Sequence, residues 1–489
     1  MFSKPLTAFC VLAIVFAVSC SVLGADLYVG AATTDITPDQ PAALSGQFHL
    51  RISTGVESPV TANIVVIESR EGDRSVDLAA MVSCDVVIVP WDVLEMVRQG
   101  VAKQLPDFDT SKVFLAATHT HTAPELRLDK WVLPKEGVTQ VEEYRQFFAD
   151  QIAGAIVKAW KGRAKGSVTW GLSHAVVAQN RRAVYADGRA QMYGKTNTKD
   201  FRGLEGYEDH DIGTMFFWND AGKLVAVLVN VSCPSQEVES RRATNADFWH
   251  PVREALRKKW GADVCVVGLC GAAGDQSPHL MYRKAAEERM RKLRGLERLD
   301  EIARRVVTAA EDAYEAVKDD RHTDVTVVHE VETVVLPMRL VTEAEYAEAK
   351  AGVDAAMSKI KKDPKATDRE NRRMKWYQAT VDRFERQKTE PNPVMEMEMH
   401  VVRIGGAVIC TNQFELFTDF GIRMKGRSKA EQTFVVQLVG PGTYLPTARA
   451  VRGGHYSAIV HSSRVGPEGG QVLVDKTVEL IDSMWADGK

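Results

Sequence analysis

The sequence predicts an α/β fold that carries a helical hairpin insertion. Apolar runs of strand length recur at residues 62–67, 77–82, 113–117, 224–229 and 264–269. Segments of helical periodicity lie between some of these runs, notably residues 91–103 and 144–161, and such alternation is typical of an α/β protein. The 489 residues can bury a large core, either as one large domain with insertions or as about three domains of roughly 150 residues.

Further elements follow in the second half of the chain. Residues 282–318 have helical character, and Gly295 predicts a break in that helix, because glycine is a poor helix former. Residues 325–340 regain strand character. Three methionines alternate with polar residues over 395–400, which indicates a strand with a packed face. The Gly-Gly pair that follows predicts a hairpin turn into residues 407–410.

A charged stretch between the strand-like segments 325–340 and 395–400 predicts two helices. Thr342 with Glu345, and Thr367 with Glu370, have the spacing of capping boxes at helix starts. We interpret residues 341–390 as a helical hairpin insertion within one catalytic domain. Its many charges are expected to form a solvated face.

Composition excludes some partners. The chain has 62 Lys and Arg against 65 Asp and Glu, a net charge of -3, which argues against a nucleic-acid footprint. It also gives no electrostatic case for binding a membrane surface. Outside the first 25 residues the five cysteines are odd in number and sparse, so a disulfide framework is not expected.

The N-terminus has the features of a signal peptide. Lys4 supplies a positive charge, residues 8–18 are apolar, and small residues follow. We therefore expect residues 1–25 to direct export and residues 26–489 to form the mature protein. Lipoprotein processing at Cys20 is a second alternative. No later segment has about 20 uninterrupted apolar residues, so no membrane-spanning helix is expected.

His119 and His121 are the first candidates for chemistry. They follow the strand predicted at 113–117, and binding groups collect at the carboxyl ends of strands in α/β sheets. If the strand continues, the two side chains point the same way. Without support from other residues, two polar loop histidines would be the more ordinary interpretation.

A glycine-rich turn at residues 268–279 is the second candidate. It follows an apolar strand and contains Asp275 and Ser277. Glycines let backbone N–H groups converge on an anion or a developing oxyanion. The turn lacks the Gly-Lys-Ser/Thr of a phosphate-binding loop and the pattern of a serine-hydrolase elbow. A purely structural strand-to-helix turn is the alternative.

Other candidates are spread along the chain. Arg181 can clamp a carboxylate or a polarised carbonyl, although adjacent arginines usually lie at the surface. Cys233 precedes a proline at the end of a strand, and an inert core thiol is its ordinary interpretation. Glu415 stands among apolar residues, where a buried carboxylate needs a partner such as zinc or an arginine. Tyr444 and Tyr456 lie in glycine-containing segments further on.

Taken in order, these segments resemble the neutral/alkaline non-lysosomal ceramidase family. The resemblance covers most of the mature chain outside the helical insertion and predicts a mixed β-sheet catalytic domain of the neutral ceramidase type. The twelve-residue step from Tyr444 to Tyr456 also fits the family. The matching positions are the Thr34–Pro38 turn, Gly46, Ser83-Cys84-Asp85, His119-Thr120-His121, Asn180-Arg181, Gly274-Asp275-Gln276-Ser277-Pro278, Glu415, Tyr444 and Tyr456.

The resemblance implies roles for individual residues. It implies that His119, Glu415 and Tyr444 are zinc ligands, and that His121 and Arg181 face the substrate. Ser277 corresponds to a serine that the family needs for activity, and Tyr456 to a tyrosine beside the scissile amide. The implied cofactor is a Zn²⁺ ion.

Two departures from the family pattern stand out. Cys233 occupies the place of the second zinc histidine, and the family's immunoglobulin-like C-terminal domain is not expected here, because the sequence ends about thirty residues after Tyr456. A thiolate is a good zinc ligand, so the predicted ligand set is His119, Cys233, Glu415 and Tyr444.

The function implied by the resemblance is hydrolysis of an N-acyl amide, with ceramide as the family substrate. Zinc-activated water would attack the carbonyl, Tyr456 or His121 would stabilise the oxyanion, and His121 would protonate the leaving nitrogen. Ser277 is expected to act as a substrate anchor or in oxyanion support rather than as the nucleophile, because no base adjoins it in the sequence. The alternatives are hydrolysis of another ester or amide, or a non-catalytic exported binding protein. A lipid substrate would imply transient membrane contact, and no obligate protein partner is indicated.

Overall fold

The computed structural model describes residues 25–128, 130–363 and 367–485. The predicted signal peptide, apart from Ala25, and the alternative lipoprotein site at Cys20 therefore lie outside the described residues. Within them, no helix is both long enough and apolar enough to cross a bilayer.

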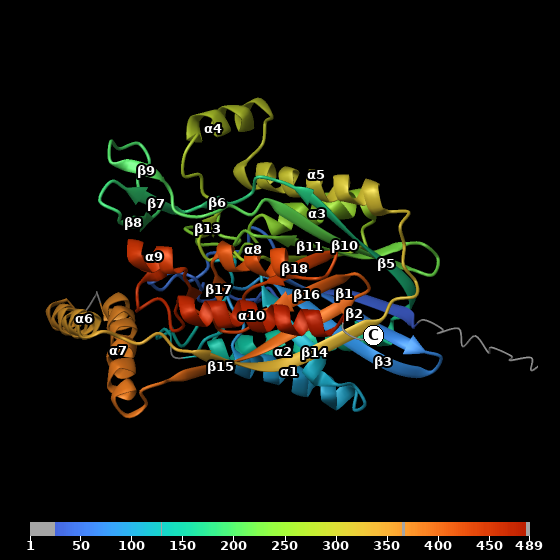
Figure 1. The fold of residues 1–489 in the computed structure, drawn as a ribbon, viewed down its shortest axis with the longest axis horizontal. Helices are drawn as coiled ribbons and strands as arrows, with labels where there is room; N and C mark the ends of the chain where they lie inside the picture. The colour runs from blue at the N-terminus through green and yellow to red at the C-terminus, as the bar shows by residue number, and fades with distance from the viewer. Residues whose placement is uncertain (1–24, 129, 364–366, 486–489) are drawn as a thin grey trace, which may run out of the picture.

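An eight-stranded mixed sheet forms the centre of the molecule (Figure 1). Neighbouring strands run antiparallel except for the pairs β11–β12 and β3–β4, which are parallel. The strands in spatial order are β12 (Cys265–Cys270), β11 (Leu224–Val231), β10 (Asp211–Asn219), β5 (Ala164–His174), β1 (Asp26–Asp35), β2 (Thr61–Glu71), β3 (Arg74–Cys84) and β4 (Val113–Ala117).

A smaller sheet packs on one face of the large one. Its strands in order are β14 (Val327–Pro337), β15 (Val394–Ile404), β16 (Ala407–Thr411) and β18 (Gln432–Val436). A continuous buried cluster joins the two sheets and includes Met81 and Phe114 from the large sheet with Ile404 and Phe434 from the small one. Strands buried on both faces need near-continuous apolar sequences, which explains the apolar runs.

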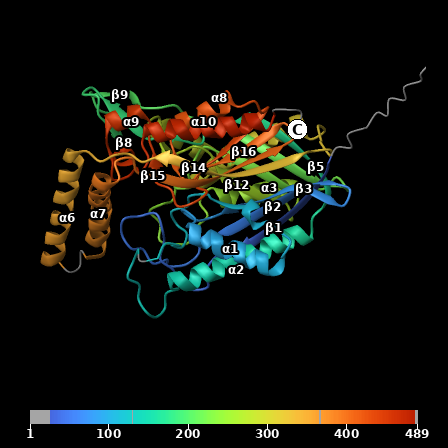
Figure 2. The same ribbon diagram turned by 60° about the horizontal axis from the view of Figure 1, so that its bottom comes forward.

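Helices cover the two outer faces, so the molecule has four layers in the order helix, sheet, sheet, helix (Figure 2). The large sheet is covered by α1 (Trp91–Gln104), α2 (Val141–Lys161), α3 (Trp249–Trp260) and α5 (Arg298–Val317). The small sheet is covered by α8 (Thr418–Arg427) and α10 (Pro467–Ser483). The predicted α/β class with a mixed sheet is confirmed.

The two predicted insertion helices are α6 (Glu343–Lys362) and α7 (Thr367–Thr389), which pack against each other at one end of the molecule (Figures 1 and 2). Thr342 caps α6 through the predicted capping box with Glu345. The helix expected over 282–318 is divided into α4 (Lys284–Leu293) and α5, and Gly295 adopts a positive φ of 67° in the break.

Two short strand pairs bring distant segments together near one end of the large sheet. They are β6 (Gln179–Asn180) with β13 (Gln276–Ser277), and β17 (Glu415–Leu416) with β19 (Tyr444–Leu445). A separate three-stranded sheet consists of β7 (Arg182–Tyr185), β8 (Ala190–Met192) and β9 (Phe201–Leu204). The remaining short helices are α9 (Ala448–Gly453) and the 3₁₀ turns Thr110–Lys112 and Tyr456–Ala458.

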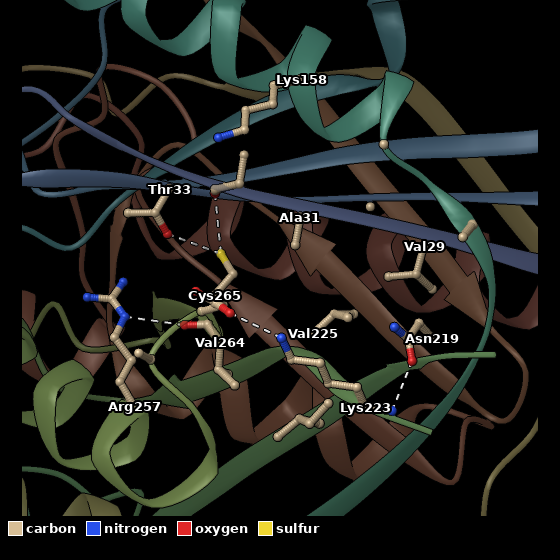
Figure 3. A pocket seen from close by; sticks show the side chains of 17 residues that line it. Val29, Ala31, Thr33, Lys158, Asn219, Lys223, Val225, Arg257, Val264 and Cys265 are labelled. Carbon is tan, nitrogen blue, oxygen red and sulfur yellow. Dashed lines mark hydrogen bonds and ion pairs between the residues drawn. The ribbon is translucent and has the colours of Figure 1, made fainter. Parts of the chain in front are cut away.

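A cavity of about 520 Å³ lies where β1 separates from β5 (Figure 3). Its lining includes Lys223, Arg257 and Cys265, whose thiol lies 3.3 Å from the carbonyl oxygen of Ala32. Lys223 precedes β11, Cys265 begins β12 and Arg257 lies near the end of α3, so this cavity is at the amino ends of these two strands. The predicted site residues His119, Cys233 and Ser277 instead follow the carboxyl ends of β4, β11 and β12.

A buried ion pair fixes the carboxyl ends of β3 and β4 to α3. Asp85 accepts two hydrogen bonds from Arg253, at 2.6 and 2.9 Å, and both side chains are almost fully buried. Asp85 also accepts hydrogen bonds from the Thr61 amide at 2.9 Å and the Thr118 hydroxyl at 3.2 Å. It therefore fixes the residue that immediately precedes His119.

Arg253→Ala is expected to lower the free energy of unfolding by about 3–5 kcal/mol, because it leaves a buried carboxylate without its partner. Arg257 lies one turn further along α3 and pairs at 3.5 Å with the exposed Glu254, so Arg257→Ala should cost less than about 1 kcal/mol. Urea denaturation measures both values. Equal losses in the two variants would contradict a structural role for the buried pair.

Candidate metal centre

Loops from both halves of the chain form a small cavity of about 110 Å³ beyond the sheet. The parallel pair β17–β19 places Glu415 directly beside Tyr444. The lining residues are Gly46, Gln47, Phe48, Val87, Ile88, His119, His121, Arg127, Lys130, Arg372, Glu415, Gly442, Tyr444 and Tyr456.

His119 is held by the backbone around it. The strand ends at Ala117, so the histidines lie just past its end and the strand does not continue through them. His119 instead adopts a left-handed φ of 68°. Its amide donates to the carbonyl of Val86 at 3.0 Å, and its ring Nδ1 lies 2.8 Å from the carbonyl oxygen of Val87. Since a carbonyl only accepts, Nδ1 carries the proton and the Nε2 lone pair faces the cavity.

His121 is held by two polar neighbours. Gln236 accepts from Arg181 at 2.8 Å through Oε1, so its amide nitrogen is the group that lies 3.1 Å from Nε2 of His121. Nδ1 of His121 lies 3.1 Å from a carboxylate oxygen of Glu239. Burial lowers the pKa of His121 to about 4, although Glu239 opposes the shift. The imidazole is therefore neutral at pH 7.

Glu415 and Tyr444 face the two histidines. A carboxylate oxygen of Glu415 lies 3.4 Å from Nε2 of His119, and the phenol of Tyr444 hydrogen-bonds the same carboxylate. Burial alone would raise the pKa of Glu415, but His119 and then Arg181 outweigh it and hold the pKa below its ordinary value. Burial and the adjacent Glu415 raise the pKa of Tyr444 well above its ordinary value.

The donor separations match a tetrahedral metal. Zinc binds imidazole nitrogen and carboxylate oxygen at about 2.0–2.2 Å, so two ligands of a tetrahedral ion lie roughly 3.3–3.5 Å apart. Nε2 of His119 lies 3.4 Å from both Nε2 of His121 and Oε2 of Glu415. In the part of the chain that the structure describes, no three His, Cys, Asp or Glu side chains form a metal-binding group by themselves. The geometry thus supplies two ligand pairs that share His119, with the Tyr444 phenol as a further donor.

Cys233 does not join these donors. It is fully buried in the apolar cluster that includes Phe248 and Trp249, and its thiol lies 3.5 Å from the carbonyl oxygen of Pro234. Burial and the neighbouring Cys270 raise the pKa of the thiol well above its ordinary value, which disfavours the thiolate that binds metals. The turn after β11 sends this side chain into the core, and Gln236 reaches His121 instead.

Arg181 and Ser277 lie behind the cavity wall. Arg181 donates to the phenolic oxygen of Tyr444 at 3.2 Å and to the carbonyl of Gly274 at 2.9 Å, and it is 2% exposed. The Ser277 hydroxyl is fully buried and lies 3.0 Å from the Tyr193 hydroxyl. Neither residue lines the cavity, so the geometry favours positioning roles over the substrate contact expected for Arg181.

Tyr456 lines the cavity beside Tyr444, with ring centroids 5.6 Å apart. Burial and then Glu415 raise the pKa of Tyr456, so the phenol keeps its proton at neutral pH. It is therefore available as a hydrogen-bond donor to a group in the cavity.

Several cavity residues were missed by the sequence reasoning. Arg127 and Lys130 both bind the buried carboxylate of Glu125. Arg372 belongs to the insertion, whose charges were all expected to face solvent, and this expectation is wrong for Arg372. The charged cluster shortly after His121 was visible in the sequence, whereas the contribution of α7 depends on how the hairpin docks.

The fold and these donors define a four-layer α/β protein with a candidate metal centre. It is similar to the crystal structure of neutral ceramidase from Pseudomonas aeruginosa, with a TM-score of 0.64 and 15% identity over 94% of this chain and 75% of that chain. The structure of a ceramidase complexed with C2 gives a TM-score of 0.63 and 14% identity, again covering 94% of this chain and 75% of that one.

No protein-family model matches the sequence, and no curated protein proved similar to it. At these identities the two solved structures establish a shared ceramidase-like fold. The chemistry of the cavity is therefore argued from its own residues.

Gly46 makes room for His121 and offers a test of this packing. Gly46 has a φ of 93°, and a Cβ there would lie 2.4 Å from Cγ of His121. Gly72 also has a positive φ, of 61°, but no atom lies within 4 Å of its added Cβ.

Gly72→Ala should lower the free energy of unfolding by about 1–2 kcal/mol, which is the cost of the left-handed backbone alone. Gly46→Ala should cost about 1–3 kcal/mol more, because the new methyl group overpacks the imidazole. Chemical denaturation measures both variants. The same loss in both would show that His121 moves aside freely and that Gly46 does not hold it in place.

Proposed function

We propose that this protein is a zinc-dependent hydrolase that cleaves an N-acyl amide bond. The observation that supports it best is the convergence of imidazole, carboxylate and phenol donors on one cavity of a ceramidase-like fold. Export through the N-terminal segment and transient membrane contact through a lipid substrate remain predictions.

We propose His119, His121, Glu415 and Tyr444 as the zinc ligands, with His121 in place of Cys233. Metal-bound histidines usually donate their second N–H to a carbonyl or a carboxylate. His119 does so to Val87 and His121 faces Glu239, so both rings turn Nε2 toward the same place, and a zinc ion at Nε2 of His121 would displace the hydrogen bond from Gln236. Cys233 does not line this cavity, because its side chain is buried in the apolar core.

A bound zinc ion would supply a Lewis acid and a water molecule whose pKa lies near neutrality. Tyr456 would donate a hydrogen bond to the carbonyl oxygen as negative charge develops on it. Arg181 would hold Glu415 and Tyr444 in position from behind. His121 does not suit the proton-donor role, because burial lowers its pKa to about 4 and its N–H faces Glu239.

The ligand assignment predicts the metal content of three variants. Cys233→Ser should keep a single zinc ion per chain after exhaustive dialysis, whereas His121→Ala should lose it. Glu239→Gln should weaken zinc binding by about 10-fold to 100-fold, because it removes the carboxylate that orients His121. Elemental analysis and competition with a chromophoric chelator measure these values.

The opposite pattern would reverse the assignment. If zinc is lost from Cys233→Ser and retained by His121→Ala, the thiol is the ligand and His121 is not. Circular dichroism of each variant separates metal loss from unfolding.

The proposed reaction predicts that the zinc-loaded protein hydrolyses N-acyl amides faster than simple esters of matching acyl length. Tyr456→Phe should lower kcat by about 10²-fold to 10³-fold through loss of an oxyanion donor. The exposed Tyr207 supplies the control, since Tyr207→Phe should leave kcat unchanged. Substrates with N-acyl sphingoid, N-acyl amine and ester bonds form the panel.

Two results would contradict the proposal. An acyl-enzyme trapped on Ser277 would replace attack by metal-activated water with covalent catalysis. Failure of the zinc-loaded protein to turn over any acyl amide would favour a binding protein instead.

A further inference from the structure

We propose that the substrate carries a carboxylate close to the scissile amide, as in an N-acyl amino acid, and that Arg372 and Arg127 form the subsite that binds it. This inference rests on the proposed hydrolase function and specifies its substrate class. It begins from the charge of the part of the cavity lining formed by Arg127, Lys130 and Arg372.

That wall carries more positive than negative charge. Arg127, Lys130 and Arg372 all line the cavity. Glu125 is the carboxylate they face, and it is already engaged by Arg127, at 2.8 and 2.9 Å, and by Lys130. Arg127 therefore neutralises Glu125, burial and then the neighbouring Arg127 lower the pKa of Lys130 to about 7, and Arg372 adds a further positive charge.

Arg372 has no partner to neutralise it. Among the described residues, no hydrogen bond or ion pair engages its guanidinium, and the groups that act on it electrostatically are Arg127, Glu125 and Tyr456. A partly buried guanidinium beside another guanidinium is unfavourable unless an anion joins them. A substrate carboxylate would satisfy the guanidinium of Arg372 with charge-assisted hydrogen bonds, and Arg127, whose Nε and Nη2 bind Glu125, would add its charge and its remaining Nη1 group.

The insertion fixes Arg372 over the cavity. Trp376, one turn further along α7, packs edge-on against Phe48 at 6.0 Å and lies 6.3 Å from Tyr456. The Thr380 hydroxyl, another turn on, lies 2.8 Å from Nδ1 of His461. Residues four apart share a face of a helix, so Arg372 lies on the docked face of α7.

The size and polarity of the cavity agree with a compact charged group. Its volume of about 110 Å³ is below the roughly 300–1,000 Å³ of sites that enclose a drug-sized ligand. A neutral lipid amide such as ceramide has no charge to offer these arginines. The acyl chain would have to leave the cavity past the aromatic residues at its rim.

The test compares two ligands of nearly equal size. N-hexanoyl glycine carries the carboxylate, and N-hexanoyl glycinamide replaces it with a neutral amide. Calorimetry on metal-free protein, in which metal-dependent turnover is absent, should show binding about 10-fold to 100-fold tighter for the carboxylate, the range expected for hydrogen bonds to a charged group. The zinc-loaded protein should show the same preference in kcat/KM.

Arg372→Gln should abolish this preference, and Arg372→Lys should retain part of it, because lysine keeps the charge but loses the fork. Arg373 is the matched control, since it is exposed and occupies the next position on α7. Arg373→Gln should bind both ligands as the unmodified protein does. Circular dichroism confirms that each variant is folded.

Four results would overturn the inference. They are equal binding of the two ligands, binding of neither ligand, an unchanged preference in Arg372→Gln, and a preference for N-acyl sphingoid amides. The binding measurement stands apart from the reaction. A carboxylate preference lost in Arg372→Gln, in a protein that hydrolyses no amide, would support the subsite and reject the proposed function. Hydrolysis of both amides at equal kcat/KM would do the reverse.

Discussion

The candidate site depends on the position of one imidazole. His119 is fixed by two backbone carbonyls from the loop after β3, and its Nε2 then lies 3.4 Å from both His121 and Glu415. A lone pair held against a carboxylate is favourable only when a cation or a proton lies between them. The buried Asp85–Arg253 pair holds the residue before His119, so the stability of the large sheet and the geometry of the site are linked.

The second constraint is that the donors come from distant parts of the chain. β4 delivers the histidines, the turn after β11 delivers Gln236, and the β17–β19 pair sets Glu415 beside Tyr444. Only the packing of the small sheet on the large one brings these ends together. The geometry of the site therefore depends on the packing of both sheets.

The helical hairpin adds positive charge to a cavity whose candidate metal ligands are a carboxylate, two imidazoles and a phenol. Part of the lining presents two imidazoles, a carboxylate and two phenols. Another part presents the basic side chains of the 127–130 segment and of α7. This ceramidase-like fold thus has a cavity lined in part by basic residues. Fold similarity at 15% identity does not determine the substrate, so we argue the substrate from these local groups.

The sequence by itself determined the α/β class, most of the strands and helices, and the hairpin insertion. It also identified His119, His121, Glu415, Tyr444 and Tyr456 as candidate site residues. Periodicity and capping are local properties, so they can be read from neighbouring residues. The tertiary structure decided which side chains share the cavity. It turned Cys233 into the core, placed Arg181 and Ser277 behind the wall, and brought Arg372 from the insertion to the cavity. Those positions depend on contacts between segments hundreds of residues apart, which no local pattern encodes.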